Sequence, residues 1–239
     1  AKIKGIAEEK YHDKFTVNVQ DGSVCMGSAF HNWALSVPYM QEKDIGYKEI
    51  IDGYESENVD DIRKKAALHE VILNAVIKHH PNPKVSAEYR IPKIWHGDVE
   101  SPLGKSLVSC DPSGPMAFVV TKVVVDPQAG EIAAGRLFSG TMTRGNEGYM
   151  NRAKQSQRIQ QVYIYNGAKK EIVDKVPCGN IIGVGGLKGA YPGETVTIGE
   201  DTPFEQITHL FDPVITKAIE AKKPSDLPKL IEVLIQVGK

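Results

Sequence analysis

The chain has 239 residues and a mass of 26.2 kDa, enough for one large domain or two of ordinary size. Hydrophobic residues make up 41% and charged residues 25%, with a mean hydropathy of −0.28, so the chain can bury a core and intrinsic disorder is excluded. The net charge of −1 excludes a histone-like neutraliser of nucleic acid, and no apolar run reaches the roughly 18 residues of a transmembrane helix.

The first elements predict a β-hairpin. Residues 15–19 alternate between apolar and polar, Asp21-Gly22 is a tight-turn signal, and residues 24–26 form a second short strand. A loop of small residues, Gly27-Ser28-Ala29-Phe30, follows.

Residues 37–80 predict helices, because apolar side chains recur at helical spacing, most clearly from Leu68 to Ile77. Residues 41–70 contain nine acidic and five basic groups, a net charge of −4. Pro81-Asn82-Pro83 ends the last of these helices.

From about Ile91 the pattern predicts strands. Residues 116–125 are rich in β-branched side chains, and Gly or Pro recurs every 8–12 residues afterwards, which is typical of a closed barrel or a sandwich. The charge also reverses, because residues 136–170 contain seven basic groups and one acid, a net charge of +6. Near the end, residues 214–221 predict a strand, Pro224-Ser225-Asp226 a helix start, and residues 227–237 an amphipathic helix, which together resemble half of a domain.

Two glycine motifs suggest phosphate binding but do not fit it. Gly104-Lys105-Ser106 lacks the earlier glycine of a P-loop, since Val99 occupies that position, so a surface linker is the better interpretation. Residues 183–189 resemble a dinucleotide fingerprint, but Lys188 stands where the third glycine is needed and a turn follows, so tight barrel corners explain these glycines.

The chemistry-bearing side chains favour a binding protein over a catalyst. The sequence shows no Ser-His-Asp, Cys-His or paired-carboxylate pattern, and His69 and His80 lie about 16 Å apart on a helix, too far to share a metal. Three cysteines without a CxxC pair argue against a disulfide framework and a cysteine zinc site, and fit a reducing cytosol. The basic strip is either an RNA-binding face, with Tyr149, Tyr163 and Tyr165 as stacking groups, or a solvated surface with barrel-wall aromatics.

Several phrases in a consistent order resemble the elongation factor G/elongation factor 2 family of translational GTPases in its archaeal form. They are Gly27-Ser28-Ala29-Phe30-His31-Asn32-Trp33, the stretches 68–83 and 89–95, Cys110-Asp111-Pro112, residues 135–140, 177–181 and 193–195, and the stretches 212–214 and 224–230. The resemblance implies a mixed α and β chain. Residues 1–105 would be the C-terminal part of a P-loop GTPase domain, residues 106–211 a translation-factor β-barrel (domain II), and residues 212–239 the first strand and helix of a ferredoxin-like α+β domain III.

The same resemblance implies a ribosomal translocase that uses GTP or GDP with Mg²⁺ in its full-length form. The P-loop, the Asp-x-x-Gly switch and the Asn-Lys-x-Asp motif of the family are not in this sequence, so we expect an internal fragment that neither binds GTP usefully nor hydrolyses it. We expect no catalytic or metal-binding residues. A partial guanine-binding edge is implied at Ser28, Ala29 and Phe30.

The implied partners are the small-subunit rRNA of the ribosome and the rest of the factor, in the cytoplasm, with no membrane or DNA. The candidate rRNA-facing residues are Arg144, Arg152, Lys154 and Arg158, because arginine and lysine gain by releasing counterions from phosphates. Two alternatives stay open: the same region of a release or ribosome-protection factor, and a free-standing RNA-binding barrel.

Overall fold

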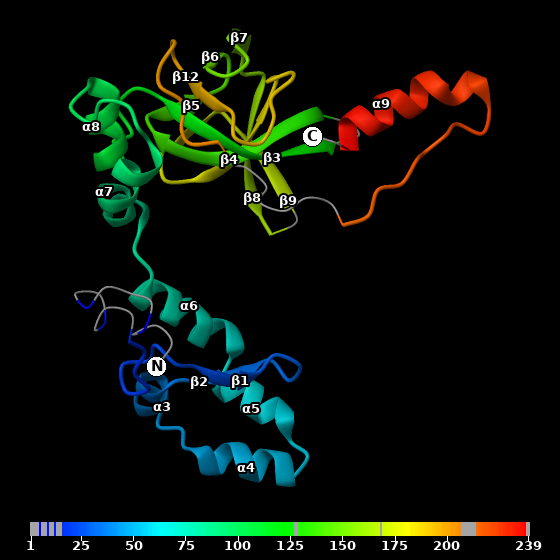
Figure 1. Cartoon of the computed structure of the whole chain (residues 1–239). Helices are drawn as coiled ribbons and strands as arrows, with labels where there is room; N and C mark the ends of the chain where they lie inside the picture. The colour runs from blue at the N-terminus through cyan, green and yellow to red at the C-terminus, as the bar shows by residue number, and fades with distance from the viewer. Residues whose placement is uncertain are drawn as a thin grey trace. The chain divides into compact units, whose positions relative to one another are not determined.

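The computed structural model describes residues 16–126, 129–167, 169–206 and 214–237, together with Gly5, Glu9 and His12. Packing divides the chain into two units, Ala1–Pro81 and Asn82–Lys239. Figure 1 shows a mainly helical first unit and a second unit built on strands, so the predicted mixed α and β class is confirmed. The division by packing falls before the predicted domain boundary at residues 105 and 106, because the helix over residues 83–94 and the helix over residues 102–109, which spans that boundary, pack with the strands of the second unit.

Four helices and a two-stranded hairpin make up the described part of the first unit. They are β1 (Met26–Ser28), β2 (Trp33–Leu35), α3 (Val37–Lys43), α4 (Tyr47–Glu55), α5 (Val59–Lys65) and α6 (Leu68–His79). The helices predicted over residues 37–80 are confirmed. Helix α6 ends at His79, next to the predicted stop at Pro81-Asn82-Pro83.

The hairpin lies one step further along the chain than the sequence predicts. Residues 16–18 form no strand, Asp21-Gly22 lies in a turn, and β1 pairs instead with β2, joined by the loop of residues 29–32. Phe15 lies outside the described residues. Tertiary hydrogen bonds decide the outcome, because the Ala34 amide donates to the Ala66 carbonyl at 3.0 Å and so ties β2 to the end of α5.

A small core holds the first unit together. Its buried members are Ala34, Leu35, Tyr39, Ile45, Ala66 and Val71. The Tyr39 hydroxyl donates to a Glu70 carboxylate oxygen at 2.8 Å. Burial, and then the hydrogen bond and charge of Glu70, raise the pKa of Tyr39 to about 12.

Two helices, α7 (Pro83–Ile94) and α8 (Pro102–Ser109), open the second unit where the sequence predicts strands from Ile91 onward. That prediction is wrong for residues 91–109. Pro92 normally disfavours a helix interior, but α7 continues past it because Ile91 is fully buried and Trp95, at the helix end, is 2% exposed. Both side chains pack in one cluster with Leu107 of α8 and Val119 of the sheet, so tertiary packing overrides the local signal.

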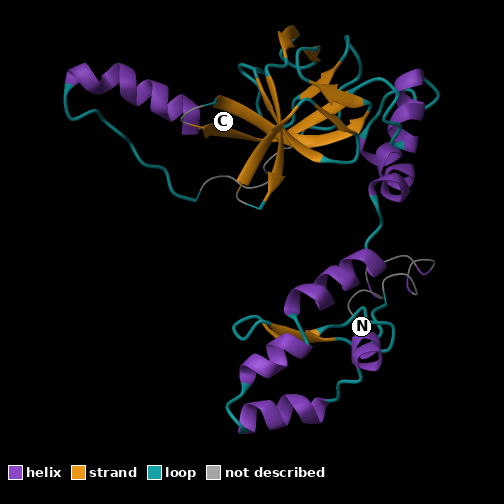
Figure 2. Cartoon of the chain, turned by 180° about the vertical axis from the view of Figure 1, so that it is seen from behind, coloured by secondary structure: helices purple, strands orange, loops and turns teal. Residues whose placement is uncertain are grey.

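Antiparallel strands form the rest of the second unit, as Figure 2 shows in orange. Eight of them pair in the order β7-β6-β12-β3-β4-β11-β8-β9, and β5 pairs with β10. The bounds are β3 (Ala117–Asp126), β4 (Gly130–Ser139), β5 (Thr141–Thr143), β6 (Glu147–Met150), β7 (Gln155–Arg158), β8 (Gln161–Asn166), β9 (Lys169–Val173), β10 (Lys175–Pro177), β11 (Ile181–Gly185) and β12 (Thr195–Thr197).

Side chains from strands far apart in the sheet meet in one core, so the sheet curls into the predicted barrel. Met150 of β6, Phe118 of β3, Leu137 of β4, Val162 of β8 and Met142 of β5 are all fully buried in the same cluster. The long pair β3–β4 carries the curvature, since its register shifts between Ala117 and Phe118 and again between Val120 and Lys122.

The C-terminal helix is confirmed and the strand before it is not. A short 3₁₀ turn at Pro224–Asp226 leads into α9 (Leu227–Val237), as predicted. Residues 214–221 form no strand, because no described strand pairs with them, and Val214 is 98% exposed. Asp212 and Pro213 lie outside the described residues. Among the helices of the described ranges, none has the length and apolar character needed to cross a membrane.

Candidate nucleic-acid interface

The predicted guanine-binding edge lies at the turn between β1 and β2. The Ser28 hydroxyl accepts a hydrogen bond from the His31 amide at 3.2 Å, and the Ala29 carbonyl accepts one from the Asn32 amide at 3.3 Å. Phe30 is 89% exposed at the tip. The loop is therefore a compact turn, in which the small side chains of Ser28 and Ala29 precede the exposed Phe30 ring.

An aromatic cluster that the sequence reasoning missed supports this turn. The Tyr54 hydroxyl lies 2.7 Å from His31 Nδ1 and accepts a hydrogen bond from Trp33 Nε1 at 2.9 Å. Phe30 packs edge-on against His31, with ring centroids 4.9 Å apart. Tyr54 lies on α4, twenty-one residues beyond Trp33, so only the fold reveals the contact.

Gly104-Lys105-Ser106 is not the surface linker that the sequence predicts. These residues lie inside α8, and Gly104 and Ser106 are buried. A Cβ atom at Gly104 would meet the Asp98 carbonyl oxygen at 2.3 Å, so the glycine serves close packing, and its amide donates to the Ser101 hydroxyl at 3.0 Å. The other glycine motif, at residues 183–189, ends β11 and turns without a helix, as predicted.

The histidines offer no metal site in the described ranges, where no group of three or more His, Cys, Asp or Glu side chains could hold a metal ion. His69, His79 and His80 are all exposed on or beside α6.

Two of the four candidate rRNA-facing cations are engaged within the barrel. Arg152 is half-buried, and its guanidinium donates to the Gly193 carbonyl at 3.0 Å and to the Phe204 carbonyl at 2.7 Å. Lys154 forms an ion pair with Glu200, whose carboxylate raises the pKa of the lysine. The hydrogen bonds of Arg152 thus stabilise the fold of the barrel, and the carboxylate of Glu200 offsets the charge of Lys154.

Arg144 and Arg158 are the two candidates with exposed side chains at one place. The turn between β5 and β6 begins at Arg144, and the Gly145 carbonyl accepts a hydrogen bond from Arg158 Nε at 3.2 Å. Lys175, which sequence reasoning did not single out, pairs with Thr143 across β10 and β5 and is also exposed. We call Arg144, Arg158 and Lys175 the basic corner.

Two carboxylates border the basic corner. Glu147 lies opposite Arg158 in the β6–β7 pair, and the Asp174 carbonyl accepts a hydrogen bond from the Arg144 amide at 2.9 Å. The corner therefore has a small positive excess, far below the +6 that the linear sequence suggests for residues 136–170.

The three tyrosines of the basic strip divide by burial. Tyr163 is 1% exposed and belongs to the barrel wall, Tyr149 is half-buried, and Tyr165 is 37% exposed. Lys170 lies over the Tyr163 ring, 5.5 Å from its centroid. Tyr163 is therefore a barrel-wall residue and not a stacking group. Tyr165 has the most exposed ring of the three tyrosines.

The glycine-rich phrases that carry the resemblance bind to one another. The Gly179 amide donates to the Leu137 carbonyl at 2.7 Å, and the Cys178 amide donates to the Gly140 carbonyl at 2.9 Å. A Cβ atom at Gly135 would lie 1.9 Å from the Val119 carbonyl oxygen, so the bulged β3–β4 pair requires glycine there. These residues are thus structural parts of the barrel.

The phrase Gly193-Glu194-Thr195 is built around a buried carboxylate. Glu194 is fully buried and accepts three backbone hydrogen bonds, from the amides of Arg152 at 2.8 Å, Thr195 at 2.9 Å and Ala153 at 3.0 Å. Three charge-assisted bonds offset the cost of burying the charge.

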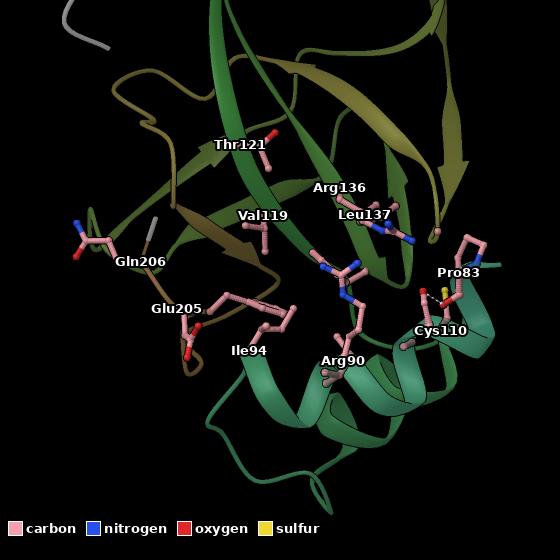
Figure 3. A pocket seen from close by; sticks show the side chains of 16 residues that line it. Pro83, Arg90, Ile94, Cys110, Val119, Thr121, Arg136, Leu137, Glu205 and Gln206 are labelled. Carbon is pink, nitrogen blue, oxygen red and sulfur yellow. Dashed lines mark hydrogen bonds between the residues drawn. The ribbon is translucent and has the colours of Figure 1, made fainter. Parts of the chain in front are cut away.

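A cavity of about 380 Å³ lies between α7 and the sheet. Figure 3 shows Arg90, Ile94 and Cys110 on its helical side and Val119 and Arg136 on its strand side. The lining is mostly apolar, with the two arginines as its cationic groups among the described residues.

Comparison with known proteins agrees with this geometry. The family described as elongation factor Tu domain 2 matches residues 130–197, the greater part of the barrel. Elongation factor 2 of Methanococcus aeolicus is 51% identical over 240 residues, which cover 99% of this chain and 33% of the relative. Elongation factor 2 of Thermococcus kodakarensis is 48% identical over 237 residues, covering 99% of this chain and 32% of the relative.

The match extends along nearly the whole chain, while the chain spans about a third of the length of these curated relatives. Elongation factor 2 of Methanocaldococcus jannaschii, 48% identical over 239 residues, gives the same result. The resemblance drawn from the ordered phrases is confirmed: the chain carries a translation-factor barrel with its flanking regions and is a relative of archaeal elongation factor 2.

Proposed function

We propose that this chain is part of a ribosomal translocase of the elongation factor 2 type, which couples GTP hydrolysis to the movement of tRNA and mRNA, and that its barrel docks on the small ribosomal subunit. The supporting observation is identity of 48% to 51% with proteins named elongation factor 2 over 99% of the chain. A factor that works on ribosomes belongs in the cytoplasm.

For GTP, the residues present fit one edge of the nucleotide only. The compact turn at Ser28, Ala29 and Phe30 can present backbone amides to the guanine O6. The one P-loop-like segment lies inside α8 and cannot cradle phosphates, which with Mg²⁺ supply most of the affinity for nucleotide. We expect no micromolar GTP affinity and no hydrolysis from this chain alone, and a calorimetric titration with GTP and Mg²⁺ checks the first expectation.

For the ribosome, we propose the basic corner as the rRNA contact of the barrel. Arg144 and Arg158 are exposed and lie beside the same turn, so both guanidinium groups can reach adjacent phosphates. Arg152 is dropped from the proposed contact because its guanidinium holds two barrel carbonyls, and Lys154 because Glu200 offsets its charge.

The test is sedimentation of the chain with purified archaeal small subunits at about 50 and about 200 mM salt, since each released counterion steepens the salt dependence. We expect binding at the lower salt that collapses at the higher one. The double variant Arg144→Glu/Arg158→Glu should remove it.

The matched control is Lys122→Glu/Lys188→Glu, which makes the same change in net charge at two exposed lysines elsewhere in the same unit. We expect this control to keep most of the binding. Equal losses in both double variants would show that only net charge matters and would contradict the basic corner. Absence of binding at either salt would contradict docking by this barrel.

A further inference from the structure

The two cysteines of the second unit lie against each other. Cys110 ends α8 and Cys178 follows β10, 68 residues later, yet their sulfur atoms are 3.5 Å apart. The Cys178 thiol donates to the Cys110 carbonyl at 3.1 Å, and both cysteines are free thiols. This pairing is not visible in the sequence, where the cysteines have no motif spacing.

Backbone hydrogen bonds hold both cysteines in place. The Cys110 amide donates to the Leu107 carbonyl at 3.3 Å, and the Cys178 amide donates to the Gly140 carbonyl at 2.9 Å. The residue after each cysteine is anchored as well, since the Asp111 amide donates to the Ser106 carbonyl at 3.0 Å and the Gly179 amide to the Leu137 carbonyl at 2.7 Å. The thiols are therefore brought together by the fold, and closing a bond between them costs little additional backbone order.

A route from solvent reaches the pair. Cys110 is one of the residues lining the cavity between α7 and the sheet (Figure 3), and Cys178, whose sulfur is 3.5 Å from that of Cys110, is half-buried. A molecule as small as a peroxide can enter a cavity of about 380 Å³. Cys25, the third cysteine, is exposed in the other unit and has no part in the pair.

We propose that Cys110 and Cys178 are a redox-responsive pair that a small peroxide closes into a reversible disulfide. The Cys110 thiolate attacks one peroxide oxygen, the O–O bond breaks, hydroxide leaves, and a sulfenic acid forms. The Cys178 sulfur then attacks the sulfenic sulfur, an S–S bond forms, and water leaves. Overall the two thiols lose two protons and two electrons, and hydrogen peroxide is reduced to two water molecules.

The geometry requires a small movement. A disulfide has an S–S length near 2.05 Å, so the sulfur atoms must approach by about 1.5 Å, which side-chain rotation can supply. Burial, and then the neighbouring Cys110 thiol, raise the pKa of Cys178 to about 12. The Cys178 thiol is therefore mostly protonated at neutral pH, and the closing step, in which its sulfur attacks as a thiolate, is faster as the pH rises.

The experiment uses the whole chain with Cys25→Ser, which removes the exposed thiol. Hydrogen peroxide is added at pH about 7 and about 8.5, the remaining thiols are alkylated, and intact mass and peptide maps are recorded. We expect loss of two hydrogen masses, protection of both thiols from alkylation, and one peptide pair linking Cys110 to Cys178. Dithiothreitol should reverse all three, and the reaction should be several-fold faster at the higher pH.

Two controls carry Cys110→Ala or Cys178→Ala in the same background, and neither should give a linked peptide. A second readout is thermal unfolding of the oxidised Cys25→Ser chain, whose midpoint should rise because the bond closes a long loop. The peptide map of the Cys25→Ser chain shows whether the disulfide forms even if a control variant folds poorly. Oxygen adducts on the separate cysteines, or alkylated thiols without a linked peptide, would overturn the proposal.

Discussion

The buried carboxylate of Glu194 makes the sharpest prediction about stability. Its two oxygens accept hydrogen bonds from the amides of Arg152, Ala153 and Thr195 at 2.8 to 3.0 Å, and the side chain is fully buried. Glu194→Gln keeps the shape and one acceptor oxygen. It replaces the oxygen facing the Ala153 amide with an NH₂ group, so two donors face each other.

The structure sets the size of the effect. One hydrogen bond is lost and two others change from charge-assisted to neutral. A charged acceptor contributes about 1.5–3 kcal/mol per bond and a neutral one about 1 kcal/mol, so these changes cost about 2.5–7 kcal/mol. The neutral glutamine also removes the free-energy cost of burying a charged group, which offsets part of this loss of stability. We expect a net loss of about 2–3 kcal/mol in the free energy of unfolding, or about 5–10 °C in Tm for a unit of this size.

Equilibrium urea unfolding measures this loss. Trp95 is 2% exposed in the second unit and reports its unfolding when the other tryptophan is removed by Trp33→Phe. The matched control is Glu200→Gln, the same chemical change at a side chain that is 65% exposed and paired with Lys154. The control should stay within about 0.5 kcal/mol of the parent. Equal unfolding free energies for Glu194→Gln and Glu200→Gln would refute the role of the buried carboxylate.

Two further changes test the packing of each unit. Gly135→Ala places a Cβ atom 1.9 Å from the Val119 carbonyl oxygen and should lower the free energy of unfolding in urea by about 1–3 kcal/mol. The control Gly199→Ala, whose Cβ atom would have no atom within 4 Å, should leave the free energy of unfolding unchanged. An unchanged value for Gly135→Ala would contradict the close approach. The pKa of Tyr39 is raised from 10.0 to about 12 in the folded chain, so its contribution to stability is present below pH 10 and is lost as the pH rises toward 12. Ultraviolet titration should show a phenol that ionises near pH 12 and is absent from the Tyr39→Phe variant. If that variant keeps this phenol, the assignment to Tyr39 is contradicted.

Local signals predicted the elements that local physics decides. Helical spacing from Leu68 to Ile77 and the stop at Pro81 describe α6 because amphipathic periodicity and the lack of a proline amide act within a few residues. Regular Gly and Pro spacing predicted short strands in a barrel or a sandwich for the same reason, since tight corners require these residues.

Long-range contacts explain the predictions that were wrong. Helix α7 persists through Pro92 because Ile91 and Trp95 are buried against α8 and the sheet. The hairpin forms at β1 and β2 because Ala34 binds Ala66, 32 residues away, while residues 16–18 have no strand partner among the described residues. In both cases the energy comes from partners that no window of local sequence contains.

The candidate site shows the same division. The resemblance of several ordered phrases to a known family pointed to the Ser28–Phe30 turn, and composition along the chain marked a basic stretch. Only the tertiary structure decided which basic groups are available, because the charge that a side chain offers to a partner depends on what already binds it. Arg152 holds two barrel carbonyls, whereas Arg144 faces solvent. It also decided that Cys110 and Cys178 meet, since a contact across 68 residues comes from the closing of the barrel and not from any local pattern.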